Sequence, residues 1–298
     1  MDAEGKRLSR FPSPRAICLG FRIFADLRIS LNEAVTIPME IPRSLMVLKQ
    51  LVRLVLCCCV PLFLFCCATD TTRLKDQAKA SRHLGEGYLA EGNLTAALSQ
   101  FLKAEKIYDK DPLLHYDLGL AYFGKDELDL AISHFKKAVT LKPDYSEAFN
   151  AMGRVYGQLK EWDAAISCFH QALSNLLYTT PHIALNNLGE AYRGKRDYER
   201  AIDFYRQAIQ KDPRFPNAHR GLGLTYMDMG DYGKAVTALE KALHYAPRSP
   251  LTYFDLARAY VRLSKTEKAI SAFENVVALA PDTPLADRAL AEIRKLRQ

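Results

Sequence analysis

Residues 118–143 read LGLAYFGKDELDLAISHFKKAVTLKP. An L-G-x-x-Y motif occupies residues 118–122, and an A-x-x-x-F motif occupies residues 131–135. Between them, Gly124–Asp126 has the composition of a turn. Pro143 ends the second half, because proline lacks the backbone N–H that a helix interior requires. The stretch therefore predicts two helices joined by a short turn.

The same two motifs recur along the chain. The small residue of the first motif stands at Gly85, Gly119, Gly153, Gly189, Gly223 and Ala257, so the unit repeats every 34 residues with one step of 36. The last residue of the second motif follows in register, at Phe101, Phe135, Phe169, Tyr205, Leu239 and Phe273. A single helix pair of this kind cannot bury its apolar face alone, so we expect the units to stack into one array.

This pattern, L-G-x2-Y…A-x3-F…P with a period of 34, resembles the tetratricopeptide repeat. The resemblance implies an all-α fold, a right-handed superhelical solenoid of six helix-turn-helix repeats plus a C-terminal capping helix. We place the repeats at 78–111, 112–145, 146–181, 182–215, 216–249 and 250–283, and the capping helix at 284–298.

An apolar, cysteine-rich segment precedes the repeats: residues 54–70 read LVLCCCVPLFLFCCATD. The run is shorter than the roughly 20 residues of a membrane-spanning helix. Lys49 and Arg53 precede it, as in a secretory signal. The cysteines lack metal-ligand spacing. The end of the run, Leu64 to Cys67, resembles a bacterial lipobox, which implies that the chain is cleaved before Cys67 and that the Cys67 thiol is lipidated. The alternative is an uncleaved signal anchor.

These features divide the N-terminal part into three segments. Residues 46–66 are expected to be a lipoprotein signal peptide and residues 67–77 a tether. Residues 1–45 are expected to be disordered or a non-native extension that arises from a start codon assigned too early. Ala68 after the lipidated cysteine resembles the sorting rule for the outer membrane. We therefore expect an outer-membrane lipoprotein that faces the periplasm and is held to the membrane by its N-terminal lipid.

The third unit is two residues longer than the others and ends in ALSNLLYTTPHIALNNLGEAY, residues 172–192. This junction, the lipobox and the six repeats together resemble the type IV pilus biogenesis and stability lipoproteins. The resemblance implies a protein partner, either a peptide segment or a secretin-like protein, whose assembly or stability the chain assists. Two alternatives stay open: a lipoprotein of another envelope system such as exopolysaccharide export, and a cytosolic or inner-membrane adaptor that regulates an enzyme.

The sequence contains no recognisable catalytic constellation. Its seven histidines are dispersed, and Cys168 and His170, two apart on a helix, point in different directions. No phosphate-binding glycine loop is present. The net charge is +7, but no basic stripe with interleaved aromatic residues marks a nucleic-acid site. We therefore predict a scaffold rather than an enzyme, with no cofactor, no metal, no small-molecule substrate and no nucleic acid.

The concave surface is the default binding site of such a solenoid. Its first helices are predicted to contribute an apolar strip, two asparagines for a peptide backbone and several arginines for carboxylates. The predicted groove residues are Leu113, Tyr116, Leu120, Phe123, Asn150, Arg154, Asn186, Arg193, Arg220, Arg258 and Arg262. The alternative is a solvated face whose charges serve solubility.

The lipobox leads to a prediction about processing. The mature chain should begin at Cys67 and be heavier than its sequence by the mass of its acyl groups, as intact-mass analysis will measure. Cys67→Ala should leave the fold intact and abolish outer-membrane fractionation, because this thiol carries the diacylglycerol. Recovery of an unmodified chain that retains Met1 would contradict the prediction.

Overall fold

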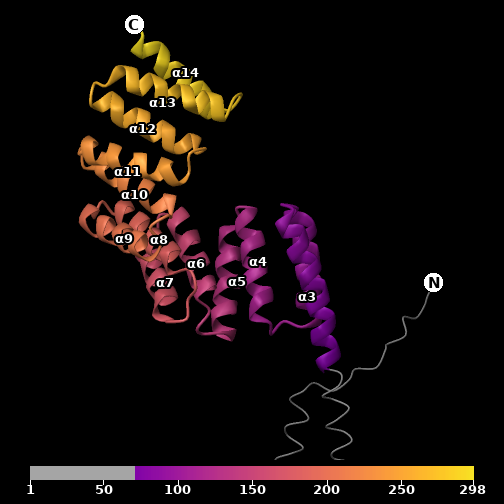
Figure 1. Cartoon of the computed structure of the whole chain (residues 1–298). Coiled ribbons are helices and arrows are strands. Elements are labelled where there is room, and N and C mark those ends of the chain that lie inside the picture. The colour runs from indigo at the N-terminus through magenta and orange to yellow at the C-terminus, as the bar shows by residue number, and fades with distance from the viewer. Residues whose placement is uncertain (1–70) are drawn as a thin grey trace, which may run out of the picture. The chain divides into compact units, whose positions relative to one another are not determined.

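The computed structural model describes residues 71–298, which contain helices and no strand (Figure 1). Residues 71–90 are helical. The helices that follow are α3 (Leu94–Ile107), α4 (Pro112–Gly124), α5 (Leu128–Leu141), α6 (Ser146–Gln158), α7 (Trp162–Ser174), α8 (Pro181–Gly194), α9 (Tyr198–Lys211), α10 (Pro216–Asp228), α11 (Tyr232–Tyr245), α12 (Pro250–Arg262), α13 (Thr266–Leu279) and α14 (Pro284–Leu296). The predicted extension (1–45), signal peptide (46–66) and lipidated Cys67 lie outside the described residues.

Consecutive helices pack in pairs, and the pairs stack in chain order. In Figure 1, α4–α6 run up and down whereas α11–α14 run across, so the helix direction rotates along the array. The first helices of successive pairs, α4, α6, α8, α10 and α12, also contact one another, whereas the second helices make no comparable contact within the described residues. The first helices therefore form the inner layer. The predicted all-α solenoid of six helix pairs and a capping helix is confirmed.

The helix that opens the first repeat begins before the predicted repeat boundary at residue 78. The tether predicted over 67–77 is helical in its described part, residues 71–77, and continues without a break into the first helix of the first repeat. The stretch TRLKDQAKA, residues 72–80, is rich in Leu, Lys, Gln and Ala, which favour helix. Residues 71–77 are nevertheless exposed, as expected for a helix end that no preceding repeat covers. No helix within residues 71–298 is both long and apolar enough to cross a bilayer.

The turn inside each repeat has one backbone geometry. One residue per turn has a positive φ, between 54° and 80°: Gly92, Asp126, Lys160, Arg196, Gly230 and Ser264. The next residue donates its N–H to the carbonyl of the motif tyrosine, as Glu127 does to Tyr122 at 3.0 Å. This is the Schellman arrangement, which satisfies a carbonyl left free at a helix end. Four of these six positions are not glycine, so the hydrogen bonding of the turn outweighs the conformational preference of the residue.

The two helices of a repeat meet where a glycine faces an aromatic ring. A Cβ atom at Gly85, Gly119 or Gly153 would lie 2.5 Å from a ring carbon of Phe101, Phe135 or Phe169, respectively. Gly189 faces the ring of Tyr205 in the same way, at 2.8 Å. These rings are buried, with no more than 2% of their surface exposed. Because the surrounding core is close-packed, the rings have little room to move.

This contact predicts opposite outcomes for two glycines of α6. Gly153→Ala should lower the free energy of unfolding by about 1–3 kcal/mol, because the added methyl overlaps the Phe169 ring. Gly157→Ala is the matched control, since a Cβ there would have no neighbouring atom within 4 Å. It should stabilise the helix by about 0.5–1 kcal/mol. Thermal and denaturant unfolding will measure both changes. Equal stability of the two variants would refute the assigned register.

Candidate functional site

A hollow with a volume of about 770 Å³ lies over the C-terminal repeats. Helices α8, α10, α12 and α14 of the inner layer supply most of its lining, with contributions from α11 and α13. The lining residues are Arg193, Leu224, Met227, Asp228, Tyr232, Phe254, Arg258, Val261, Arg262, Phe273, Arg288, Ala291, Glu292 and Lys295. We call it the C-terminal groove. Its mixture of apolar and charged side chains is typical of a binding site.

Cations outnumber acids in the C-terminal groove. Its two acidic residues are already paired, Asp228 with Arg193 at 3.0 Å and Glu292 with Lys295 at 2.7 Å. Among the described residues, no ion pair includes Arg262 or Arg288, and the Nε–H of Arg262 donates to the Tyr232 hydroxyl at 3.0 Å. Their guanidinium groups instead lie over aromatic rings, that of Tyr232 at 5.1 Å and that of Phe254 at 4.8 Å.

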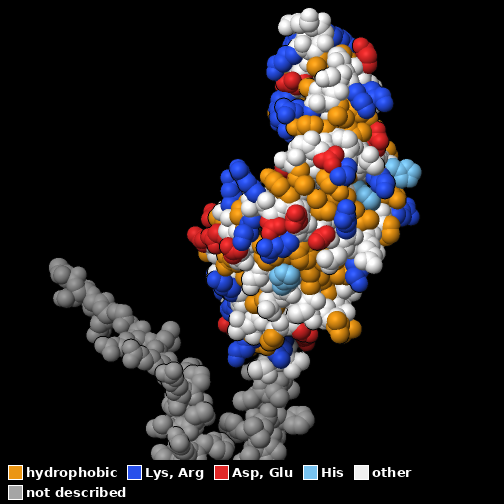
Figure 2. Space-filling view, turned by 90° about the vertical axis from the view of Figure 1, so that its left-hand side faces the viewer, with side chains coloured by type: hydrophobic (Ala, Val, Ile, Leu, Met, Phe, Trp, Pro, Cys, Tyr) orange, Lys and Arg blue, Asp and Glu red, His pale blue; other side chains and the backbone are white. Residues whose placement is uncertain are grey.

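These two arginines are therefore held in place by the rings, with hydrogen-bond donors left over for a ligand. The face in Figure 2 carries Lys and Arg side chains together with Asp and Glu side chains among apolar ones.

Two of the predicted groove arginines serve as ties between repeats. Three Arg–Asp ion pairs join first helices at an offset of 35 residues: Arg82 with Asp117 at 3.8 Å, Arg193 with Asp228 at 3.0 Å and Arg220 with Asp255 at 2.7 Å. Arg193 still lines the C-terminal groove, but Arg220 does not. Burial raises the pKa of Asp117 to about 7 and also raises the pKa of Asp255. These aspartates are thus costly to bury as anions without their arginines.

The predicted asparagines lie farther along the inner layer, toward the N-terminal repeats. The Asn186 amide donates to Asn187 Oδ1 at 3.4 Å, and the Asn187 amide donates to Asn150 Oδ1 at 3.0 Å. A second hollow of about 310 Å³ opens beside them, and Phe123, Arg154 and Asn187 are among its lining residues. Asn187, which we did not predict, therefore faces this hollow. Asn150 and Asn186 are not among its lining residues; both are hydrogen-bonded to Asn187.

Some residues of the predicted apolar strip pack against the core, whereas another is exposed to solvent. Tyr116 packs against the rings of Phe135 and Tyr145, with centroid distances of 5.9 and 5.1 Å. Its burial raises the pKa of its hydroxyl to about 12. Leu120 also packs against the core between the second and third repeats. Leu113, by contrast, is 41% exposed. Tyr116 and Leu120 thus contribute mainly to the stability of the array.

The long third junction holds an exposed apolar tip. Tyr178 is buried and packs beside Phe149, while the Asn175 amide donates to the carbonyl of Asp144 at 3.0 Å. Between these two anchors, Leu176 and Leu177 are 98% and 86% exposed. The two extra residues therefore produce a fixed loop that presents two leucines to solvent.

The periodic motifs and the stacked helix pairs agree with the comparisons. Profiles described as tetratricopeptide repeats match residues 83–146, 148–182 and 226–293, and one described as a TPR repeat matches residues 189–230. The chain is a tetratricopeptide-repeat protein. A comparison with curated proteins finds no matching sequence.

Solved structures match this solenoid over most of its length. PilW, described as a widely conserved type IV pilus biogenesis factor, has a TM-score of 0.66 at 22% identity, covering 72% of this chain and 98% of PilW. PilF of Pseudomonas aeruginosa has a TM-score of 0.61 at 19% identity, covering 73% of this chain and 99% of PilF. A chain of the APC/C hetero-tetramer Cut9–Hcn1 has a TM-score of 0.64 at 19% identity, covering 74% of this chain and 43% of that one. At these identities the likeness establishes the fold.

The sequence analysis did not predict that the capping helix α14 contributes to the C-terminal groove. Arg288, Glu292 and Lys295 all line it. Their spacing of four and three residues places them on one face of α14. That spacing was the available signal, but α14 was interpreted only as a cover for the last repeat.

Cys168 is a core residue of the solenoid. It is 7% exposed, and burial raises the pKa of its thiol to about 11. The thiol is therefore protonated at neutral pH, whereas nucleophilic cysteines are thiolates. His170 is exposed and contacts the Phe204 ring edge-on at 6.0 Å.

The Arg220–Asp255 tie predicts a pH-dependent loss of stability. Because burial raises the folded pKa of Asp255 above its ordinary value of 3.8, ionisation of this group opposes folding as the pH rises above that value. Removing Arg220 raises the folded pKa further. Arg220→Ala should therefore cost about 1.5–3 kcal/mol at pH 7 and less near pH 4. Denaturant titrations at both pH values will measure the difference.

The control for this prediction is the double variant Arg220→Ala with Asp255→Asn, which lacks the carboxylate that Arg220→Ala alone leaves unpaired. Its stability relative to that of Asp255→Asn alone, which also lacks the carboxylate, should not vary between the two pH values. An equal loss at both pH values in Arg220→Ala alone would show that lost packing, not an unpaired carboxylate, causes the effect.

Proposed function

We propose that the protein is a lipid-anchored periplasmic scaffold that binds a protein of the type IV pilus machine, the secretin in particular, and assists its assembly or stability. Tetratricopeptide solenoids are suited to protein–protein interaction, and the likeness to PilW and PilF supports the pilus role. The lipobox around Cys67 supports the anchor. Export of exopolysaccharide and a cytosolic adaptor role are the alternatives that the experiments below separate.

The observation that carries the proposal is the surplus of cations in the C-terminal groove. Arg262 and Arg288 have no carboxylate partner among the described residues, and each is held over a ring. Arginine binds carboxylates through two parallel hydrogen bonds. A partner segment with acidic side chains and one or two apolar side chains would complement this groove.

The size of the groove fits a segment rather than a whole domain. Its volume of about 770 Å³ falls within the range of sites that enclose small ligands or a few side chains, about 300–1,000 Å³. An extended acidic segment would lie across the inner helices α10, α12 and α14. Leu176 and Leu177, exposed on the third junction, offer a second, apolar contact for the body of the same partner.

Charge reversal in the groove should abolish partner binding. Arg262→Glu with Arg288→Glu should weaken it at least tenfold, since each charge-assisted hydrogen bond contributes about 1.5–3 kcal/mol. In cells that lack the native protein, this variant should not restore secretin multimers, surface pili or twitching motility. The matched control is Arg248→Glu with Arg294→Glu, which makes the same change in net charge at exposed residues outside the groove lining.

Three outcomes separate the possibilities. Full complementation by the groove variant would place the binding surface elsewhere on the solenoid. Normal secretin multimers and piliation in cells without the gene would remove the pilus role, and polysaccharide export would then be measured in the same cells. An unprocessed chain in the soluble fraction would favour the cytosolic adaptor.

A further inference from the structure

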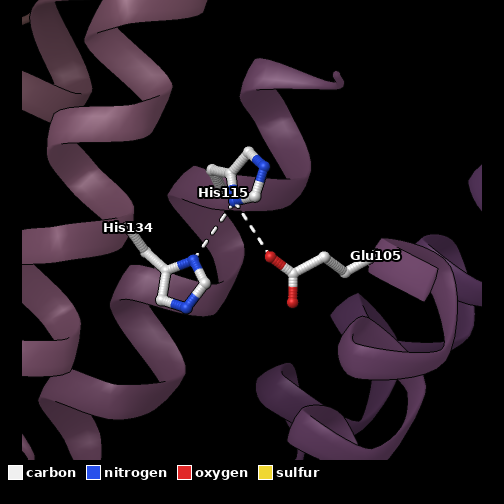
Figure 3. Close-up of side chains that lie close together, drawn as sticks. All are labelled: Glu105, His115 and His134. Carbon is white, nitrogen blue, oxygen red and sulfur yellow. Dashed lines mark hydrogen bonds and ion pairs between the residues drawn. The ribbon is translucent and has the colours of Figure 1, made fainter. Parts of the chain in front are cut away.

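Three helices of the first two repeats bring together two histidines and a glutamate. Glu105 lies on α3, His115 on α4 and His134 on α5, and all three side chains point toward one another (Figure 3). The Nδ1 atoms of the two imidazoles are 3.1 Å apart, and Glu105 Oε1 lies 3.9 Å from His115 Nδ1. One ligand atom from each residue lies within 4.8 Å of the other two.

The hydrogen bonds around His115 orient its free nitrogen toward this cluster. Its Nε2 lies 2.8 Å from the carbonyl oxygen of Asp109. A carbonyl can only accept a hydrogen bond, so Nε2–H is the donor, and in neutral His115 the lone pair is on Nδ1. Metal-bound histidines commonly donate their second ring N–H to a carbonyl in this way, which fixes both the tautomer and the ring orientation.

His134 is held by stacking on both sides. Its ring lies parallel to that of Tyr122, with centroids 5.3 Å apart and an interplanar angle of 13°. Its other neighbour is the His115 ring, at 5.4 Å and 18°. Burial lowers the pKa of both imidazoles.

We propose that Glu105, His115 and His134 bind one divalent transition-metal ion, and that zinc fits the site best. Two imidazoles and a carboxylate are ligands that zinc takes. For Zn–N bonds of 2.0–2.1 Å, the ligand atoms of a tetrahedral site are about 3.3 Å apart, close to the 3.1 Å found between the two imidazoles. Magnesium and calcium prefer oxygen ligands and are not expected here.

The site is open enough for an ion to enter. His115 is fully buried, but the Glu105 side chain is 27% exposed and His134 is partly exposed. Rotation of the Glu105 side chain closes the remaining distance, and a water molecule takes the fourth position. Lys137, with its Nζ 3.7 Å from Glu105 Oε1, opposes the ion with its positive charge. Since Glu105 belongs to the first repeat and both histidines to the second, the ion would join two repeats.

The test uses the tag-free mature protein, which begins at Cys67, stripped of metal with a chelator. Titration with zinc in a calorimeter should show one saturable site per chain, and saturation should raise the melting temperature. Cobalt at the same site should produce the intense visible absorption of tetrahedral coordination. Magnesium and calcium should do neither.

Variants separate this site from adventitious binding. His134→Gln and Glu105→Gln should each weaken zinc binding at least tenfold and remove the increase in melting temperature, with circular dichroism confirming the fold. The control is His83→Ala, which removes another histidine in contact with a glutamate, Glu86 at 2.7 Å, and should bind zinc as the parent does. Lys137→Ala should bind zinc more tightly. Absence of a saturable site in the parent chain, or unchanged binding in His134→Gln, would overturn the proposal.

Discussion

The contact between a glycine on one helix and an aromatic ring on the next determines how closely the helices of a repeat approach. At Gly119 and Gly153 there is no room even for a methyl group, because a buried phenylalanine ring fills the space. The two helices therefore cross at a short distance with little freedom to shift. The inner layer of the first four repeats depends on that distance, since these contacts position its helices. In the fifth repeat Gly223 faces Leu239 instead of a ring, and in the sixth Ala257 takes the place of the glycine.

The repeat architecture could be predicted from the sequence because each motif residue has a local role that recurs with the period. The N-terminal boundary of the array was not predictable in the same way. Residues 71–77 carry no motif residue, and only their preference for helix continues the first helix of the array. The Tyr116 side chain was assigned to a ligand surface because it lies on a first helix. Its packing against Tyr145, the residue that precedes α6, depends on how the chain turns from the second repeat into the third, which a periodic pattern does not specify.

Only some of the binding residues could be predicted from the sequence. Arg193, Arg258 and Arg262 were predicted as groove residues, and all three line the C-terminal groove. Arg220 was predicted with them, but it faces Asp255 in the next repeat, and the sequence gives no sign of which arginine pairs and which remains free. The cluster of Glu105, His115 and His134 was missed because its members are 10 and 19 residues apart. No motif has that spacing, and only the meeting of three helices brings the side chains together.

The restriction of contacts to neighbouring repeats has a mechanical consequence. A chain of units joined only in sequence behaves as a spring, because small rotations at successive junctions add to a large change in the distance between its ends. No single junction then has to break for the coil to lengthen. The C-terminal groove is lined by α8 and by α10 to α14, so an occupant would bridge several repeats at once. Binding there would therefore stiffen one half of the molecule and leave the other half compliant.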